Sequence, residues 1–136
     1  MEGRKFIVRK DLLYPELSYD INNVLFDVFR QLGFGHPEKY YQKAVATGLQ
    51  TKGIKFIEQF YVPLKFNGQI VGKYFLDFLI EDVVILELKK DYLFNYTTIN
   101  QSKQYLYALN LQLALIAYFT KQGVVTKRVI NLPPVS

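Results

Sequence analysis

The chain has 136 residues, 50% hydrophobic and 21% charged, and this length and composition predict one packed domain spanning residues 1–136. Because cysteine is absent and histidine occurs once, the sequence excludes disulfides and thiolate chemistry, and it leaves carboxylate oxygens as the ligands for any metal. The formal net charge of +5 favours a polyanionic partner such as nucleic acid, although a solvated basic surface explains the charge equally well.

The N-terminal segment is basic and polar. Residues 1–15 contain Arg4, Lys5, Arg9 and Lys10, and we expect them to form an N-terminal extension, either an arm or an additional strand. This segment lacks the apolar core of a secretory signal, and the most apolar stretch, residues 111–119, is too short to span a bilayer. We therefore expect a cytoplasmic protein with no membrane partner.

Two helices are predicted next. From Ser18, apolar residues recur at three- and four-residue spacing, which is the pattern of an amphipathic helix, and Gly33 ends it. Pro37 suits the first position of a second helix, and Glu38 falls in its first turn, where the helix dipole favours a carboxylate. This second helix is expected to run to about Thr51.

Three strands follow the helices. Residues 54–66 are rich in aromatic and β-branched side chains, and the Asn-Gly pair at 67–68 is a hairpin signal that returns the chain as a strand over 70–80. A turn at 81–82 then leads into residues 83–89, which are apolar on both faces, as in a central strand.

The C-terminal third is predicted to contain a helix and one or two strands. A polar loop over residues 95–98 precedes a helix over 99–109, which leads to a strand over 113–119 that Gly123 breaks. A final strand over 127–130 is optional. The order ααβββαβ, with or without that last strand, predicts an α/β fold with a mixed sheet flanked by helices.

Charged residues interrupt the expected central strand at its end. Glu87 and Lys89 lie two positions apart, so both side chains point to the same face, beside Ile85. A carboxylate and an ammonium at the end of a buried strand are costly unless other charges compensate them. A bound cation or a salt bridge would provide that compensation.

Asp77 lies on the preceding strand, and its carboxylate would meet that of Glu87 if the two residues share a face of the sheet. Two such carboxylates form an oxygen site suited to Mg²⁺. The parity of the position sum 77 + 87 = 164 requires an odd-numbered loop or a bulge, because a plain two-residue turn would separate the two residues. On spacing alone, an ion pair between Glu87 and Lys89 with a solvated Asp77 explains the pattern equally well.

The spacing of these residues resembles a family signature. Asp77, with Glu87-Leu88-Lys89 beginning ten residues later, is similar to the D…ExK signature of the PD-(D/E)XK nuclease superfamily. Leu76 stands where the superfamily name places a proline, a position that varies within the superfamily. The resemblance implies a restriction-endonuclease-like core.

Two further motifs strengthen the resemblance. Gly35-x-x-Glu38-x-x-Tyr41 is similar to the motif that names the GxxExxY branch of this superfamily. Gln101 and Tyr105, one helical turn apart after the ExK strand, resemble the Gln-containing helix of the family. The resemblance covers about residues 17–131.

The resemblance implies metal-assisted hydrolysis of DNA or RNA phosphodiesters, with DNA as the preferred partner. Asp77, Glu87 and the main-chain carbonyl of Leu88 would hold Mg²⁺, with Mn²⁺ as an alternative ion. Lys89 would orient a water molecule and stabilise developing negative charge.

Helper residues are implied as well. Glu38 would supply another carboxylate, and Gln101 would position water or phosphate, although Glu38 could instead serve only its helix N-terminus. Tyr41 and Tyr105 are interpreted as packing residues whose hydroxyl groups form hydrogen bonds, and His36 as a cap or surface residue. The implied catalytic set is Glu38, Asp77, Glu87, Lys89 and Gln101.

Two alternatives to a nuclease remain open. The first is a noncatalytic module on the same fold that binds nucleic acid or protein. The second is an interaction protein, for instance a homodimer formed through the aromatic-rich strand over residues 56–66. Several basic residues could line a phosphate track or form a solvated face: Lys90, Lys103, Lys127 and Arg128.

Overall fold

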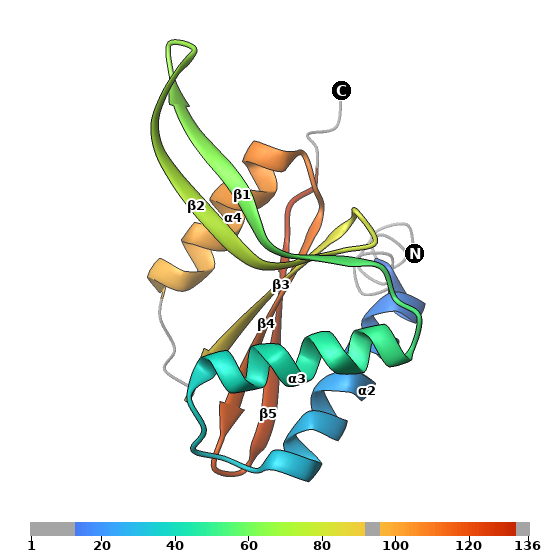
Figure 1. Cartoon of the computed structure of the whole chain (residues 1–136). Coiled ribbons are helices and arrows are strands. Elements are labelled where there is room, and N and C mark those ends of the chain that lie inside the picture. Colours follow the sequence, from blue (N-terminus) through green and yellow to red (C-terminus); the bar gives the residue numbers. More distant parts are fainter. Residues whose placement is uncertain (1–12, 92–95, 133–136) are drawn as a thin grey trace, which may run out of the picture.

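In the computed structural model, which describes residues 13–91 and 96–132, one mixed sheet carries helices on both faces (Figure 1). The predicted α/β architecture is confirmed, including the optional last strand. Most of the predicted basic extension lies outside the described residues. No helix in the described ranges is long and apolar enough to cross a bilayer.

The first two helices form where the apolar periodicity predicts them. Helix α2 (Pro15–Leu32) begins three residues before Ser18, because Pro15 is preorganised for the first helical position. Gly33 ends it with a φ of 72°, and its main-chain N–H donates to the carbonyl of Phe29 at 2.8 Å. Helix α3 spans Glu38–Thr51.

The strands lie in the order β1-β2-β3-β4-β5, with only β3 and β4 parallel. The Asn-Gly hairpin turn is confirmed, because both of its residues have positive φ values. The strand bounds are β1 Phe56–Phe66, β2 Gln69–Ile80, β3 Val84–Lys90, β4 Leu113–Thr120 and β5 Gly123–Ile130.

Two predicted boundaries were wrong. Helix α4 (Tyr96–Leu109) already includes Thr97 and Thr98, which were predicted to lie in a loop, because the first turn of a helix tolerates residues of low helix propensity. Strand β5 begins at Gly123 and not near Lys127, since β4 turns directly into it and Thr120 pairs with Gly123. Gly123 is therefore the first residue of the last strand and pairs with the end of β4 across the hairpin.

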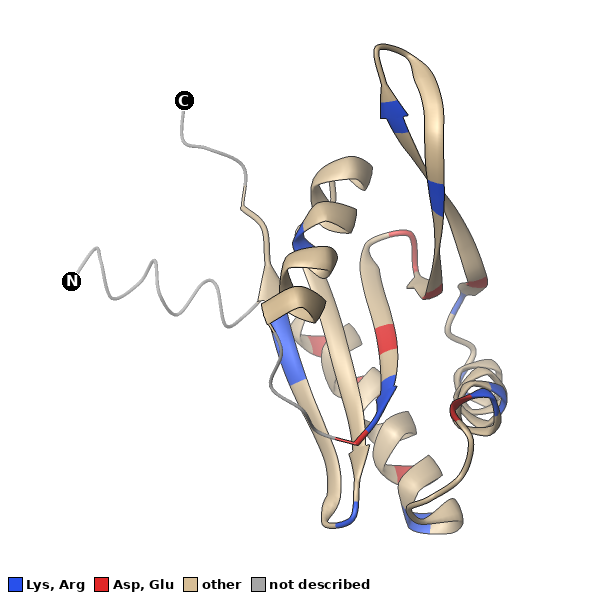
Figure 2. Cartoon of the chain, turned by 90° about the vertical axis from the view of Figure 1, so that its left-hand side faces the viewer, with Lys and Arg blue, Asp and Glu red and all other residues tan. Residues whose placement is uncertain are grey.

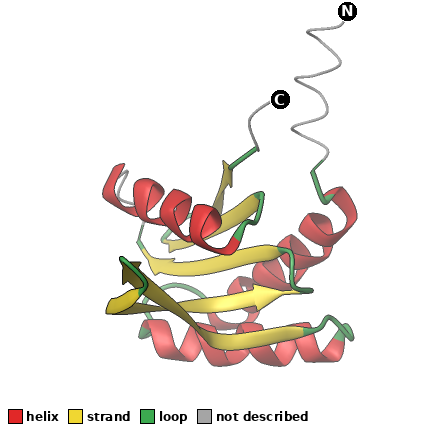
Figure 3. Ribbon diagram, turned by 90° about the horizontal axis from the view of Figure 1, so that it is seen from above, coloured by secondary structure: helices red, strands yellow, loops and turns green. Residues whose placement is uncertain are grey.

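The core has two layers, one on each side of the sheet (Figure 3). Helices α2 and α3 cover one face, where Phe78, Leu86 and Leu88 are buried. Helix α4 covers the other face, where Leu79 and Ile85 are buried. All of β4 is buried, so β3 and β4 form the rigid centre that positions the end of β3.

Candidate functional site

The β2–β3 turn has the odd length that brings Asp77 and Glu87 together. Ile80 pairs with Val84, so three residues (81–83) connect the strands, and the register continues as Phe78 with Leu86. These pairs sum to 164, as Asp77 and Glu87 do, so the two residues are the next positions along the same ladder. The shared face that the metal hypothesis requires is therefore present.

Lys55, just before β1, holds this turn in place. Glu81 and Asp82 have φ values of 51° and 62°, in the left-handed region that side chains rarely adopt. The Glu81 N–H donates to the Lys55 carbonyl at 2.9 Å, and the Lys55 N–H donates to the Glu81 carboxylate at 2.8 Å. The Lys55 ammonium pairs with Asp82 at 3.1 Å. These bonds offset the strain of the three-residue turn.

Beyond Phe78 and Leu86 the two strands separate, and side chains replace the ladder hydrogen bonds. The main-chain N–H of Asp77 donates to Glu87 Oε1 at 3.1 Å. The main-chain N–H of Leu88 donates to Asp77 Oδ2 at 2.8 Å. Each carboxylate is thus fixed by the opposite strand, and the two lie side by side at the point where the strands diverge.

The electrostatics of this pair are unfavourable without a cation. Burial, together with the charge of Asp77, raises the pKa of Glu87 to about 8. Burial also raises the pKa of Asp77 above its ordinary value. The Lys89 ammonium lowers both pKa values but does not restore them. Two desolvated carboxylates with hard oxygen donors are the chemistry that a divalent cation such as Mg²⁺ fits.

Glu38 lies close to this pair, at the N-terminus of α3. Burial raises its pKa, the charge of Asp77 raises it further, and Lys89 lowers it. The main-chain N–H of Lys90, at the end of β3, donates to the Glu38 carboxylate. Within residues 13–91 and 96–132, no three His, Cys, Asp or Glu side chains converge as a metal site, so Glu38 borders the pair without completing a three-carboxylate cluster.

Tyr41 holds the loop that leads into Glu38. Its hydroxyl donates to the Gly33 carbonyl at 2.6 Å and accepts from the main-chain N–H of His36 at 3.3 Å. The fully buried ring stacks on Phe119 of β4, with centroids 4.2 Å apart. The interpretation of Tyr41 as a packing residue with a hydroxyl hydrogen bond agrees with this geometry.

The same loop explains two other residues of the motif region. Gly35 has a φ of 105°, a conformation that favours glycine. A ring nitrogen of His36 lies 2.8 Å from the Leu32 carbonyl at the end of α2, which is the position of a helix cap. Both residues therefore shape the approach to α3.

Helix α4 borders the pair from the other side. Tyr105 is buried, and this burial, with the charge of Glu87 next, raises the pKa of Tyr105 to about 12. Its ring meets that of Tyr74 edge to face at 5.5 Å. Gln101 lies one turn earlier on the same side of α4 and is half-buried. Tyr105 thus lies near the carboxylates as well as in the core.

Gln59 is a neighbour of Asp77 that the sequence did not reveal. A hydrogen bond from its side chain lowers the pKa of Asp77, and Gln59 Nε2 also donates to Gln42 Oε1 at 3.1 Å. The residue has a φ of 50° within β1, between the Glu58 and Phe60 pairings. Glutamine is not a residue type that signals a left-handed conformation, so the sequence carries no signal for the position of Gln59.

Comparison with known families agrees with this geometry. The family model of the PD-(D/E)XK nuclease superfamily matches residues 15–129. The chain belongs to the PD-(D/E)XK nuclease superfamily. The matched range includes β2, β3, α3 and α4, the elements that surround Asp77 and Glu87. The predicted superfamily is thereby confirmed.

A solved structure shares the fold of this chain. The crystal structure of SSO0001 matches with a TM-score of 0.54 at 12% identity. The match covers 71% of this chain and 50% of SSO0001, so the chain spans about half the length of that protein. At this identity the likeness shows the fold alone. No curated protein matches the chain.

A groove of about 600 Å³ lies between α3 and β1, and one of its lining residues, Gln59, forms a hydrogen bond with Asp77. Lys39 and Lys43 of α3 line it, together with polar side chains such as Gln42. Lys39 directly follows Glu38 in the sequence. Among the described residues, the groove is therefore lined by two lysines and one carboxylate, that of Glu58.

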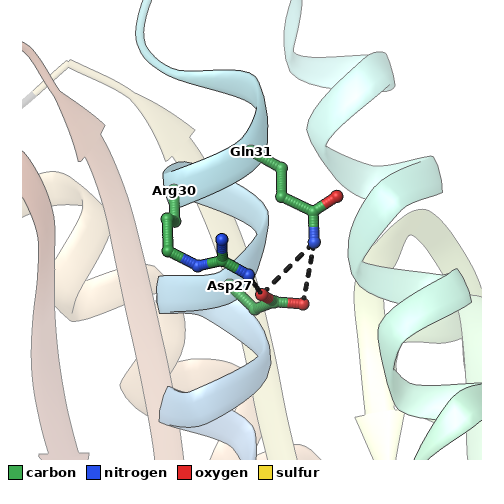
Figure 4. Close-up of polar contacts among 3 residues, drawn as sticks. All are labelled: Asp27, Arg30 and Gln31. Carbon is green, nitrogen blue, oxygen red and sulfur yellow. Dashed lines mark hydrogen bonds and ion pairs between the residues drawn. The ribbon is translucent and has the colours of Figure 1, made fainter.

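A second groove, of about 630 Å³, lies between α2 and α3 and includes none of the candidate site residues. Asp27 and Gln31 line it on the α2 side. Figure 4 shows that Arg30 and Gln31 donate to the carboxylate of Asp27. The hydrogen bond from Arg30 lowers the pKa of Asp27. These contacts lie within one helix and stabilise its surface.

Arg128, one of the residues considered for a phosphate track, lies elsewhere. Its guanidinium donates to Ser18 Oγ at 3.2 Å and to the Leu13 carbonyl at 2.8 Å. It therefore ties β5 to the start of α2. Lys90 and Lys103 are exposed.

Proposed function

We propose that this PD-(D/E)XK chain is a Mg²⁺-dependent nuclease that hydrolyses DNA or RNA phosphodiesters. The observation that carries the proposal is the pair of carboxylates on Asp77 and Glu87, each hydrogen-bonded to the opposite strand and each with a raised pKa. Perturbed carboxylates grouped next to a lysine are typical of functional sites. Superfamily membership supports the same reaction class.

The donors suit a hard divalent ion. Asp77, Glu87 and the main-chain carbonyl of Leu88 would hold Mg²⁺, or Mn²⁺ in its place. When bound, the ion would polarise the scissile phosphate and lower the pKa of a water molecule. The two side chains are already fixed by main-chain N–H donors, so little reorganisation is needed to present their oxygens.

Three neighbouring side chains would contribute to the hydrolysis. Lys89 follows Glu87 on the same face of β3, and its ammonium would orient the attacking water and stabilise charge on the phosphate oxygens. Glu38, whose pKa the charge of Asp77 raises, would accept a hydrogen bond from that water. Gln101 would position water or phosphate from α4, where it is half-buried one turn before Tyr105.

The roles of three residues in the loop and first turn of α3 support assignment to the GxxExxY branch. Gly35 supplies a backbone conformation, Glu38 borders the carboxylate pair, and Tyr41 holds the loop by its hydroxyl. One short motif thus fixes the path of the chain and delivers a carboxylate to the site.

The test is incubation of the full chain with end-labelled DNA and RNA panels in Mg²⁺ or Mn²⁺. Wild type is compared with Asp77→Asn, Glu87→Gln and Gln101→Ala. Two controls make matched changes on exposed positions: Glu16→Gln on α2 and Gln104→Ala on α4. We expect cleavage that chelator abolishes, that the first two variants lose and that both controls retain.

Three results would reject the proposal: cleavage that persists in chelator, cleavage unaffected by Asp77→Asn and Glu87→Gln, or no cleavage with either ion. Binding of the panels without cleavage would support the noncatalytic alternative on the same fold. Circular dichroism of each variant establishes that a lost activity is not a lost fold.

A further inference from the structure

The far end of the β1–β2 hairpin extends beyond the rest of the sheet (Figure 1). Strand β3 pairs with β2 only at residues 78–80, so residues 60–76 of the hairpin pair with each other alone. Val62 and Leu76, on one side of this ribbon, pack in the core cluster beneath α4. The alternation of side chains turns Tyr61 and Phe75 to the opposite side, where no helix of residues 13–91 and 96–132 covers them.

An aromatic pair occupies this uncovered side. Tyr61 and Phe75 face each other across the two strands, with ring centroids 5.7 Å apart. Tyr61 is 43% exposed and Phe75 is 48% exposed. We call Tyr61, Phe75 and the neighbouring Lys73 the arm surface. The adjacent exposed rings form an apolar patch, and contiguous apolar patches mark contact surfaces.

The charge of the hairpin over residues 60–76 favours a polyanionic partner. Between residues 60 and 76 the chain contains Lys65 and Lys73 and no Asp or Glu. Figure 2 shows these basic segments along the hairpin, with acidic segments only near its base. The Lys73 ammonium lies 5.9 Å from the centre of the Phe75 ring, so cation and aromatic face are presented together.

The arm surface is also close to the proposed reaction site. Phe75 lies two residues before Asp77 on β2, which places their Cα atoms about 7 Å apart at the rise of a strand. A base stacked on Phe75 would therefore belong to a nucleotide adjacent to a phosphate held at Asp77. Lys73, two residues further along, would meet the next part of the backbone.

A second copy of the chain is a poorer occupant. The edge strand β1 carries Pro63, which lacks an N–H donor, and its register shifts between Leu64 and Lys65. Gln59 adds a left-handed residue in the same strand. Proline, irregular register and lysine on an edge strand all oppose the addition of another strand.

We propose that the arm surface stacks on unpaired bases, and that the chain acts on single-stranded nucleic acid or on the unpaired segments of a larger substrate. This inference rests on the nuclease function proposed above. Rings of Tyr61 and Phe75 accept bases of any sequence, because every base has a stacking face, and Lys73 contacts the backbone phosphate. A paired duplex keeps its bases stacked internally and offers none to the arm.

The test measures binding without catalysis. Fluorescence anisotropy in chelator follows fluorescein-labelled oligothymidine, oligouridine and a blunt duplex of equal length, each titrated with the full chain. The variants are Tyr61→Ala and Phe75→Ala, with Tyr19→Ala and Tyr107→Ala as controls, because these tyrosines are 67% and 83% exposed on other elements. Phe75→Tyr keeps the ring and therefore the stacking face, and circular dichroism of each variant shows whether the fold is retained.

We expect tighter binding of the single strands than of the duplex. Each alanine substitution in the arm should weaken single-strand binding about five- to 150-fold, the range measured when a stacked base loses its aromatic partner. The two control variants and Phe75→Tyr should bind like wild type. The ratio between oligothymidine and oligouridine compares a DNA strand with an RNA strand, which differ in the sugar and in the 5-methyl group of the base.

Equal binding of duplex and single strand, with no loss in Tyr61→Ala or Phe75→Ala, would overturn the inference. Light scattering that shows a wild-type dimer, converted to a monomer by Phe75→Ala with unchanged oligonucleotide binding, would assign the arm to a second copy. Because binding is measured without a cation, neither result bears on the proposed function. Mg²⁺-dependent cleavage that Glu87→Gln abolishes would survive either one.

Discussion

Asp77 and Glu87 lie next to each other on neighbouring strands, and the main-chain N–H of Asp77 donates to the carboxylate of Glu87 at 3.1 Å. The N–H of Leu88 returns a bond to Asp77 at 2.8 Å, so both carboxylates form part of the strand pairing. This position costs the metal-free chain stability, because burial raises the pKa of both groups. A bound cation would therefore stabilise the folded chain.

The pH dependence of stability follows from Glu87. Its pKa is about 8 in the folded chain against 4.5 ordinarily, so between these values the folded chain binds more protons than the unfolded chain. The free energy of unfolding of the metal-free chain therefore falls as pH rises from about 4.5 to about 8, and Asp77 acts in the same direction. Glu87→Gln should be more stable than wild type by roughly 1–3 kcal/mol at pH 8 and similar at pH 5.

Urea unfolding in chelator at the two pH values measures this difference. Glu16→Gln makes the same chemical change on an exposed residue of α2 and should follow the wild-type curve. Parallel pH curves for wild type and Glu87→Gln would show that Glu87 ionises normally in the folded chain.

A divalent cation should stabilise the folded chain by mass action. At a Mg²⁺ concentration about a hundred times its Kd, the free energy of unfolding should rise by about 2.7 kcal/mol. The gain should be larger at pH 8 than at pH 6, because the ion displaces a proton from Glu87. Thermal melts with and without Mg²⁺ test this, and Asp77→Asn should lose most of the gain. An equal gain in Asp77→Asn would place the ion elsewhere.

Adjacent lysines at the end of β3 should differ in their effect on cleavage. Lys89 is half-buried and lowers the pKa values of Asp77 and Glu87, whereas Lys90 is exposed. Lys89→Ala should reduce kcat by roughly 10²–10³, the usual cost of losing one donor to developing charge. Lys90→Ala should stay within a few-fold of wild type. Equal losses in the two variants would indicate general charge attraction and no positioned role for Lys89.

Removing the hydroxyl of Tyr41 should loosen the loop before Glu38. The Gly33 carbonyl and the His36 N–H lose their partner, so Tyr41→Phe should cost about 1–3 kcal/mol of unfolding free energy. Cleavage should fall as well, because Glu38 begins α3 directly after this loop. Tyr40→Phe, on an exposed neighbour, is the matched control for denaturation and activity. A variant as stable as wild type would show that water replaces the hydroxyl.

Close packing of α2 on α3 should make substitution of Gly48 destabilising. A Cβ added at Gly48 would lie 2.7 Å from Cγ1 of Val24, so Gly48→Ala should destabilise the chain by about 1–3 kcal/mol. A Cβ at Gly72 would meet Leu64 at an ordinary 3.5 Å, so Gly72→Ala should be tolerated. Urea unfolding of both variants compares them, and equal stabilities would contradict the close approach.

Much of the fold could be predicted because its signals are local. The apolar periodicity before Gly33 and the Asn-Gly turn at 67–68 each specify an element without knowledge of its neighbours. The start of α4 and of β5 could not be predicted, since Thr97 and Gly123 have weak or opposite local preferences that the tertiary structure overrides.

The candidate site, like the fold, could be predicted from the sequence only in part. The spacing of Asp77, Glu87 and Lys89 was visible in the sequence, but their meeting depended on whether the turn had two or three residues. The residue types at positions 81–83 are compatible with a turn of either length. Gln59 could not be found at all, because its approach to Asp77 results from a left-handed residue inside a strand.

The measurement that tests the central claim most directly is an Mn²⁺ soak of crystals of the chain, followed by an anomalous difference map. We predict one strong peak in contact with the carboxylates of Asp77 and Glu87 and the carbonyl of Leu88, absent from crystals of Glu87→Gln. A map without a peak at this position at saturating Mn²⁺, or with a peak that Glu87→Gln leaves unchanged, would contradict the assignment.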